Sequence, residues 1–205
     1  MRKLLILSAL VAGLSTPALA AWQDYVVNEL NFSVTFPATP KIETISYTAP
    51  DGSSLSGKMY SVEQDNNIYR IKVIDFSGNT ISRTTVIKDA VTHFHAQGEV
   101  LEDIYARIGS DFGRNLQIKL KAGGYDYLSI YFANNRKLYI IEGVKTPASQ
   151  NAYALRYKES ISFIAPPGAG RGGAGGGGGR GGRGGAGAEG GGGRGAPPAE
   201  GAPQP

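Results

Sequence analysis

His93 and His95 are the two histidines of the sequence, and their spacing decides whether they can share a metal ion. On a β-strand, residues two apart lie on the same face and would supply two ligands of a zinc site. On an α-helix they point about 200° apart. The apolar residues of 84–97 repeat with a helical period, and no third ligand is apparent. We therefore expect neither a metal site nor a cofactor.

A cluster of carboxylates, Glu99, Glu102 and Asp103, follows the histidines. Paired carboxylates can act as general acid and base, but a solvated strand edge explains such a cluster without catalysis. The chain has no cysteine, which excludes a thiol nucleophile. It also lacks a phosphate-binding loop, a Gly-x-Ser-x-Gly elbow and a dinucleotide fingerprint. The sequence therefore favours a non-enzymatic protein without catalytic residues, and a periplasmic enzyme with a carboxylate or tyrosine site is the alternative.

Residues 166–205 form a low-complexity segment with 20 of the 30 glycines and 6 of the 11 prolines. The segment has no aromatic residue and no Val, Leu, Ile or Met, so we predict that it is disordered. Arg171, Arg180 and Arg183 each begin an Arg-Gly-Gly triplet, a pattern typical of RNA-binding tails. Such tails usually add aromatic residues for base stacking. We therefore predict a flexible spacer or a weak tether to anionic surfaces, and nucleic acid is not the expected partner.

The net charge of +4 belongs to the two ends of the chain. Arg2, Lys3 and the four arginines of 166–205 account for six of the 21 basic residues, and the same C-terminal segment holds two of the 17 acidic ones. The remaining residues, 21–165, therefore contain 15 residues of each sign. A neutral domain of this kind lacks the basic face that follows a phosphate backbone.

The first twenty residues are typical of an export signal. Two basic residues precede an apolar run at 4–14, and the small residues of Ala-Leu-Ala at 18–20 suit a signal peptidase. An apolar run of about eleven residues is too short to cross a bilayer, which takes about twenty. We predict cleavage between Ala20 and Ala21, a mature protein that is periplasmic or secreted, and no transmembrane segment after processing.

Processing at this site is expected to leave Ala21 as the first residue of the exported protein, because the apolar run is too short to act as an anchor. N-terminal sequencing of the exported form is the measurement. Met1 at the N-terminus would contradict the cleavage and the localisation together.

Alternation of apolar and polar residues predicts several strands within 21–165. The segments with this pattern are 32–36, 69–73, 113–121, 126–133 and 137–144. Turn residues lie between them at Asp51-Gly52, Asp65-Asn66-Asn67, Gly123-Gly124 and Asn134-Asn135. The last two pairs are typical of hairpins, so the last three strands are predicted to form a meander.

Two segments have a helical period instead. The apolar residues of 84–97 form one stripe, and Gly98 is the predicted C-cap. A second helix is predicted over 147–164, with Pro147 in its first turn. Strands joined by hairpins, together with two helices, predict an α+β fold, in which a single domain at 21–165 packs both helices on an antiparallel sheet.

Short motifs spread over 30–164 carry a resemblance to a known class of proteins. They are FSVTFPATPK, then Gly113-Arg114 at a strand start, then a hairpin motif, Asn-Arg-x-Tyr, matched with one residue inserted by Asn135, Arg136 and Tyr139. The chain thus resembles small exported bacterial domains of unknown function, whose layout is similar to the PsbP-like sandwich of sheet and helices. Asn115 stands where that class has a glutamate. The resemblance implies a fold and no activity.

One face of the strand at 126–133 carries Tyr127 and Tyr131. Whether Gln117 and Lys119 of the preceding strand lie beside them depends on the register across the intervening turn. If they do, the four residues form a candidate partner surface. The alternative is that the C-terminal helix covers this face and packs on the tyrosines. The sequence thus favours an exported non-enzymatic module that binds an envelope protein, a polymer or a small ligand, none of which it identifies.

Overall fold

The computed structural model of the chain describes residues 22–164. The predicted signal peptide, its cleavage site at Ala20 and Ala21, and the glycine-rich segment 166–205 lie outside the described residues. The strands within them are β1 (Gln23–Val27), β2 (Phe32–Phe36), β3 (Lys41–Thr48), β4 (Ser54–Gln64), β5 (Asn67–Asp75), β6 (Gly98–Ile108), β7 (Asp111–Leu120), β8 (Tyr125–Phe132), β9 (Lys137–Lys145) and β10 (Ser162–Phe163). The helices are the 3₁₀ turn η1 (Asn28–Leu30), α1 (Arg83–His95) and α2 (Tyr153–Lys158).

Seven antiparallel strands form the central sheet, in the order β3-β4-β5-β9-β8-β7-β6. Neighbours in this sheet are also neighbours in sequence, except that β5 pairs with β9 and thereby places Ile71 opposite Ile141. The strands β1, β2 and β10 form a second, smaller sheet. The predicted α+β class, the antiparallel sheet and the meander of β7, β8 and β9 are confirmed.

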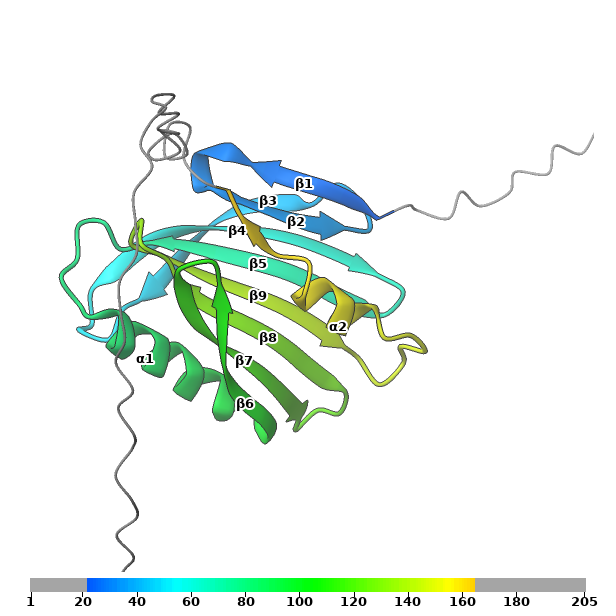
Figure 1. The fold of residues 1–205 in the computed structure, drawn as a ribbon. Coiled ribbons are helices and arrows are strands. Elements are labelled where there is room, and N and C mark those ends of the chain that lie inside the picture. Colours follow the sequence, from blue (N-terminus) through cyan, green and yellow to red (C-terminus); the bar gives the residue numbers. More distant parts are fainter. Residues whose placement is uncertain (1–21, 165–205) are drawn as a thin grey trace, which may run out of the picture. The chain divides into compact units, whose positions relative to one another are not determined.

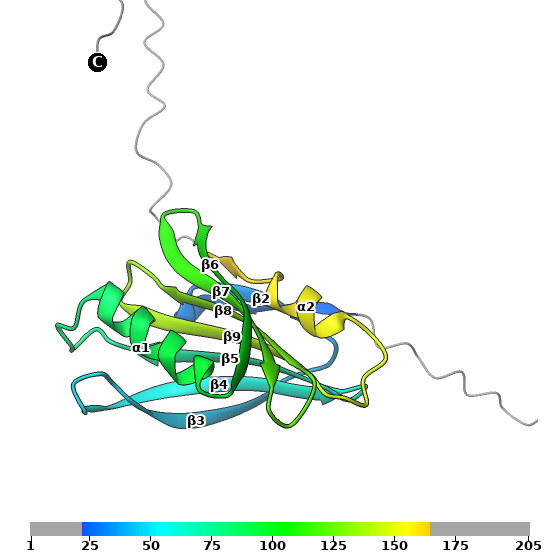
Figure 2. The ribbon, with the colours of Figure 1, turned by 90° about the horizontal axis from the view of Figure 1, so that it is seen from below.

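Each face of the central sheet has its own apolar core, because successive side chains of a strand point to opposite faces. On one face, α1 packs over residues such as Leu116, Leu128 and Ile140. On the other face, the small sheet and α2 pack over residues such as Tyr69 and Ile141. Figures 1 and 2 show α1 on one side of the sheet and β2 with α2 on the other. The domain therefore has three layers.

The helix predicted over 84–97 is confirmed as α1, within one or two residues at each end. It begins after Ser82, whose hydroxyl accepts a hydrogen bond from the backbone N–H of Thr85 at 3.2 Å. The predicted C-cap is wrong, because Gly98 opens β6 instead of closing the helix. A Cβ at Gly98 would lie 2.1 Å from the carbonyl oxygen of Lys119, so glycine is required there by the close approach of β7.

The second predicted helix, 147–164, is wrong in its bounds, because α2 covers only Tyr153–Lys158. The helix begins late, where the Asn151 side chain accepts a hydrogen bond from its first backbone N–H at 3.1 Å. It ends early because Ser162 and Phe163 pair with β2. The stretch Ile-Ser-Phe-Ile fits strand alternation as well as helical spacing, and the pairing with β2 decides between them.

The strands β1, β3, β4 and β6 were not among the predicted strands. In β3, for example, the apolar residues Ile42, Ile45 and Tyr47 do not keep the period of two by which half-buried strands are recognised.

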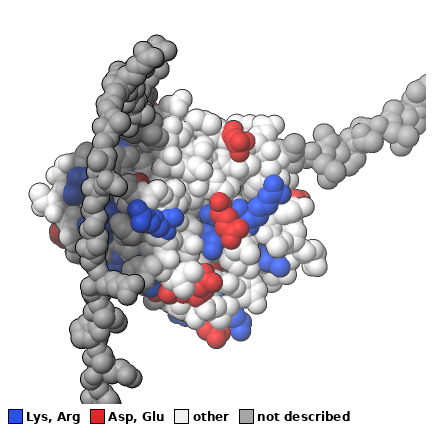
Figure 3. Space-filling model, in the orientation of Figure 1, with Lys and Arg blue, Asp and Glu red and all other residues white. Residues whose placement is uncertain are grey.

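Acidic and basic side chains lie interspersed on the face shown in Figure 3. Within residues 22–164, no helix is long and apolar enough to cross a membrane.

Candidate ligand-binding groove

A groove of about 590 Å³ separates α1 from the hairpin that β6 and β7 form. Its size lies within the range of small-molecule sites, roughly 300 to 1,000 Å³. One wall is α1, with Ile87 and Val91. The other wall is the hairpin, with Tyr105 of β6 and Phe112 of β7. The two elements leave this space because β6 lies at the edge of the sheet, beyond the strands that α1 covers most closely.

The aromatic wall of the groove is unusually exposed. Tyr105 has 85% of its surface accessible and Phe112 has 50%. Large aromatic side chains normally bury most of their surface, and apolar residues that line a cleft while remaining exposed mark interaction sites. The groove therefore offers an apolar surface that no described part of the chain covers.

Three polar side chains meet at one end of the groove. Arg114 Nε donates a hydrogen bond to Asp103 Oδ1 at 2.7 Å, and its guanidinium lies 4.4 Å from the ring centre of Tyr105. His95 Nε2 lies 3.2 Å from Asp103 Oδ2 but makes no hydrogen bond. Asp103 thus holds Arg114 against the tyrosine and joins β6 to β7.

The charge that remains in the groove is positive. Arg83 and Lys88 both line it, and among the residues described neither has an acidic group within salt-bridge distance. Arg83 donates to the neutral side chain of Asn134 at 2.6 Å. Since Asp103 is matched by Arg114, these two cations are left to attract a negative group.

Some residues singled out in the sequence lie at this groove. Gly113 and Arg114 both line it. A Cβ at Gly113 would approach the carbonyl oxygen of Ile130 to 2.1 Å, so the neighbouring strand β8 requires glycine there. Of the carboxylate cluster Asp103 lines the groove, and of the histidines His95 does. His93 and His95 do lie on a helix, as the sequence predicted.

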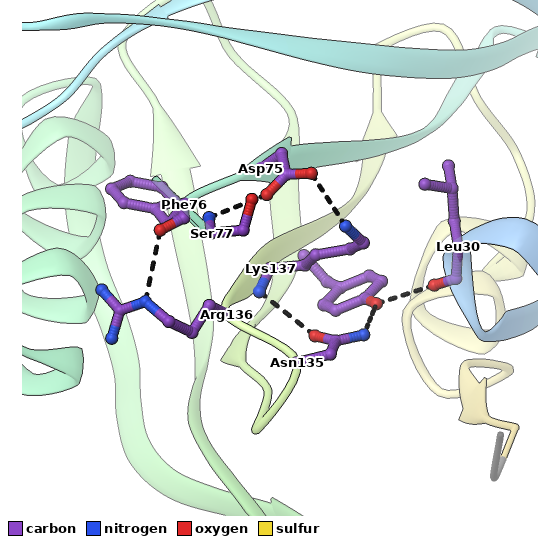
Figure 4. A network of polar contacts seen from close by, with 8 residues as sticks. Leu30, Asp75, Phe76, Ser77, Asn135, Arg136 and Lys137 are labelled. Atoms are coloured by element: carbon purple, nitrogen blue, oxygen red, sulfur yellow. Dashed lines mark hydrogen bonds and ion pairs between the residues drawn. The ribbon is translucent and has the colours of Figure 1, made fainter. Parts of the chain in front are cut away.

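Arg136, from the hairpin motif, does not line the groove but helps to position α1, one of its two walls. It adopts a left-handed backbone conformation, with φ of 58°, in the turn between β8 and β9. Its guanidinium donates to the carbonyl oxygen of Phe76 at 3.2 Å (Figure 4). It also donates to the carbonyl oxygens of Ile81, at 3.1 Å, and of Asn79. These three carbonyls belong to the loop that leads into α1. The arginine therefore fastens the start of α1 to the sheet.

Asn135 and Tyr139, the other two residues of the hairpin motif, form a second set of contacts at the same turn. The Asn135 amide donates to the Tyr139 hydroxyl at 3.0 Å, and that hydroxyl donates to the Leu30 carbonyl at 2.7 Å (Figure 4). Burial raises the pKa of Tyr139, so the hydroxyl keeps its proton. The motif thus ties together three segments that are distant in sequence.

The register across the turn at 123–124 aligns the polar residues with the tyrosines, since Gln117 lies opposite Tyr127 and Lys119 opposite Tyr125. Tyr131, however, is not a surface residue. It is only 4% exposed and packs edge-on against Phe163, with ring centres 5.6 Å apart. The candidate partner surface is reduced to Tyr127, Gln117 and Lys119, at the side of α2.

Sequence reasoning missed a buried carboxyl pair beneath the α1 layer. Glu142 is 3% exposed and forms ion pairs with Arg70 at 2.8 Å and Lys72 at 3.1 Å. Asp126 is 1% exposed, and its Oδ1 has no hydrogen-bond partner. Burial and the nearby Glu142 raise the pKa of Asp126 to about 8. The sequence did contain a signal for this pair. Asp126 lies two residues before Leu128 in an alternating strand, and therefore on the same inward-facing side.

No protein-family model matches the chain, and no curated protein sequence matches it. Among solved structures, the chain is similar to the solution structure of cyanobacterial PsbP from Synechocystis sp. PCC 6803, with a TM-score of 0.44 and 9% sequence identity. The alignment covers 75% of this chain and 99% of that chain. This weak similarity concerns the fold, for which the sequence motifs had indicated a PsbP-like layout, and does not extend to function.

Proposed function

We propose that the protein is a non-enzymatic binding module whose groove between α1 and the β6–β7 hairpin holds a ligand with an apolar or aromatic body and an anionic group. The observation that carries this proposal is the exposed pair Tyr105 and Phe112, which lines a groove whose uncompensated charges are Arg83 and Lys88. Ligand pockets combine these two features, an apolar wall and a few polar groups that orient the ligand.

The positions of the carboxyl groups favour a binding role over an enzymatic one. The carboxyl group with the strongly raised pKa, Asp126, is closed off from the groove by burial. The carboxylate that does line the groove, Asp103, is held by Arg114 and serves to position it. An acid–base mechanism needs a group of suitable pKa within hydrogen-bond reach of a substrate. Neither of these two carboxyl groups combines a strongly raised pKa with a place in the groove.

Export and a spacer role of residues 166–205 are parts of the same proposal. Export is supported by the composition of the first twenty residues, and the spacer role by the glycine content of the C-terminal segment. In this arrangement the domain would bind its ligand in the periplasm or outside the cell, with the spacer allowing it to reach a surface.

Anilinonaphthalene sulfonate, an aromatic sulfonate that fluoresces when it leaves water, is a suitable probe of the groove. The full-length mature protein is expected to bind it saturably, and Phe112→Ser is expected to weaken binding about tenfold, because it removes one apolar wall. Arg83→Ala with Lys88→Ala is expected to weaken binding as well and to reduce its dependence on salt. Fluorescence titration measures both effects.

Ile42→Ser is the matched control for this titration. Ile42 is 52% exposed on β3, at the opposite edge of the central sheet, so its replacement removes a comparable apolar surface outside the groove. Its affinity for the probe should equal that of the unaltered protein. Equal weakening by Ile42→Ser and Phe112→Ser, with circular dichroism unchanged, would contradict the proposal.

A further inference from the structure

The two edges of the central sheet differ in character. The edge strand β3 exposes one large apolar side chain among its described residues, Ile42. The other edge strand, β6, exposes four, which are Val100, Leu101, Ile104 and Tyr105, with between 38% and 85% of their surface accessible. An edge strand leaves a row of backbone N–H and C=O groups unpaired, and apolar side chains along it favour pairing with another strand.

A bulge limits the part of β6 that another strand can join. The pairing of β6 with β7 shifts by one residue between Val100 and Glu102, so Leu101 is the extra residue. Bulges interrupt regular pairing and twist an edge. From Glu102 to Ile108, in contrast, the register with β7 is continuous up to the turn at 109–110. The regular edge is therefore a segment of seven residues with Tyr105 at its centre.

We propose that this segment pairs antiparallel with the same segment of a second copy of the chain, with the two Tyr105 residues opposite each other on the two-fold axis. The two central sheets then become one continuous sheet. In this register Asp103 of each copy lies opposite Arg107 of the other. Asp103 and Arg107 are the charged residues of the segment on that face, so the two-fold axis produces two pairs of opposite charge. On the other face, Ile104 of each copy lies opposite Ala106.

The other registers of two copies are less favourable. A register centred on Asp103 places two aspartates opposite each other and extends into the bulge. One centred on Ile104 also reaches the bulged residue Leu101. One centred on Ala106 leaves only five residues in the paired segment. The register centred on Tyr105 uses the whole regular edge and has no like charges opposite each other.

The backbone groups along this edge are oriented for such pairing. Ile108 and Asp111 flank a two-residue turn, and residues in that position hydrogen-bond to each other. Alternation along the strand then predicts that the N–H and C=O groups of Asp103, Tyr105 and Arg107 point away from β7. Arg114 donates to the Asp103 carbonyl at 3.3 Å, which leaves that oxygen a second lone pair.

A single cysteine tests both the dimer and its register, because the chain has no cysteine of its own. Antiparallel neighbours lie about 5.5 Å apart between Cα atoms when hydrogen-bonded, which a disulfide can span. Mild oxidation of full-length mature Tyr105→Cys is therefore expected to give a covalent dimer on a non-reducing gel. Arg107→Cys is the control, since Arg107 lies opposite Asp103 and far from its own copy.

A second variant separates this inference from the proposed function. Ile104 lies on the face opposite the groove, and Ile104→Asp places two carboxylates diagonally across the two-fold axis. Light scattering after gel filtration is expected to show a dimer for the unaltered protein and a monomer for Ile104→Asp, with unchanged affinity of the groove for the sulfonate probe. A protein that stays monomeric at millimolar concentration, or cross-links equally at Arg107→Cys, overturns the proposal. The proposal is also overturned if an extended peptide of another protein is found to pair with this edge of β6.

Discussion

Asp126→Asn is expected to raise the free energy of unfolding at about pH 8 by up to about 5 kcal/mol, an unusual gain for a single substitution. In the unaltered protein the Asp126 carboxyl lies almost completely buried beside Glu142, and these surroundings raise its pKa from 3.8 to about 8. An asparagine has the shape of the protonated acid and cannot ionise. The variant therefore removes the cost of holding a second negative charge in this position.

The sign of the pH dependence follows from the direction of this shift. The folded protein binds the Asp126 proton more tightly than the unfolded chain does. The resulting stability is fully present below about pH 4 and is lost as the pH rises through about 8. Urea unfolding at about pH 5 and about pH 8 should show a decline between the two in the unaltered protein and a smaller decline in Asp126→Asn. A variant that loses stability at both values would show that Arg70 and Lys72 hold Asp126 ionised.

Asp75→Asn is the matched control, because its effect has the opposite sign. Burial would raise the pKa of Asp75, but the hydrogen bonds from Ser77 and the ion pair with Lys137 outweigh it and hold the pKa at about 2. A lowered pKa stabilises the fold above the pKa of the unfolded chain, and that stability is lost at acid pH. Asp75→Asn should therefore be less stable than the unaltered protein at neutral pH and should not gain at about pH 8.

Tyr131→Ala is expected to cost about 3 to 5 kcal/mol of the free energy of unfolding, because it empties a filled position of the core. Tyr131 packs against Phe163 and is 4% exposed. Tyr127→Ala, four residues earlier on the same face of β8, is expected to cost about 1 kcal/mol, since Tyr127 is only half-buried at the side of α2.

Urea unfolding at one pH measures both tyrosine variants. Equal losses would mean that Tyr127 is packed as fully as Tyr131, and would remove Tyr127 from the candidate partner surface. Unequal losses leave Tyr127, Gln117 and Lys119 as a surface whose replacement should affect partner binding more than stability.

Local sequence patterns predicted those helices and strands whose own side chains determine their secondary structure. The helix α1 has an apolar stripe with a serine before it, and the meander of β7, β8 and β9 combines alternation with glycine and asparagine turns. The same patterns failed at 161–164. There helical and strand spacing coincide, and the choice depends on β2, more than a hundred residues earlier. Strand pairing of that kind has no signal within a short window.

The candidate groove was predictable only in part, for the same reason. The sequence singled out Gly113 and Arg114 as a motif and Asp103 within a carboxylate cluster. It did not indicate that Tyr105 stays exposed, because exposure depends on the position of β6 at the sheet edge. The hairpin motif at 135–139 proved to position α1 and η1, a role that depends on carbonyl groups of other loops and so has no counterpart in side-chain patterns.

The junction between β5 and β9 has a consequence for how the chain folds. The central sheet consists of two series of sequential hairpins, β3 to β5 and β6 to β9, and within the sheet they meet where β5 pairs with β9. Each series can form from local contacts, but joining them requires closure of a long loop, which is slow. When the chain folds from its N-terminus, β5 can pair with β4 but lacks its second neighbour until β9 has followed. The first half of the sheet therefore keeps an unpaired edge at β5 until most of the domain is available.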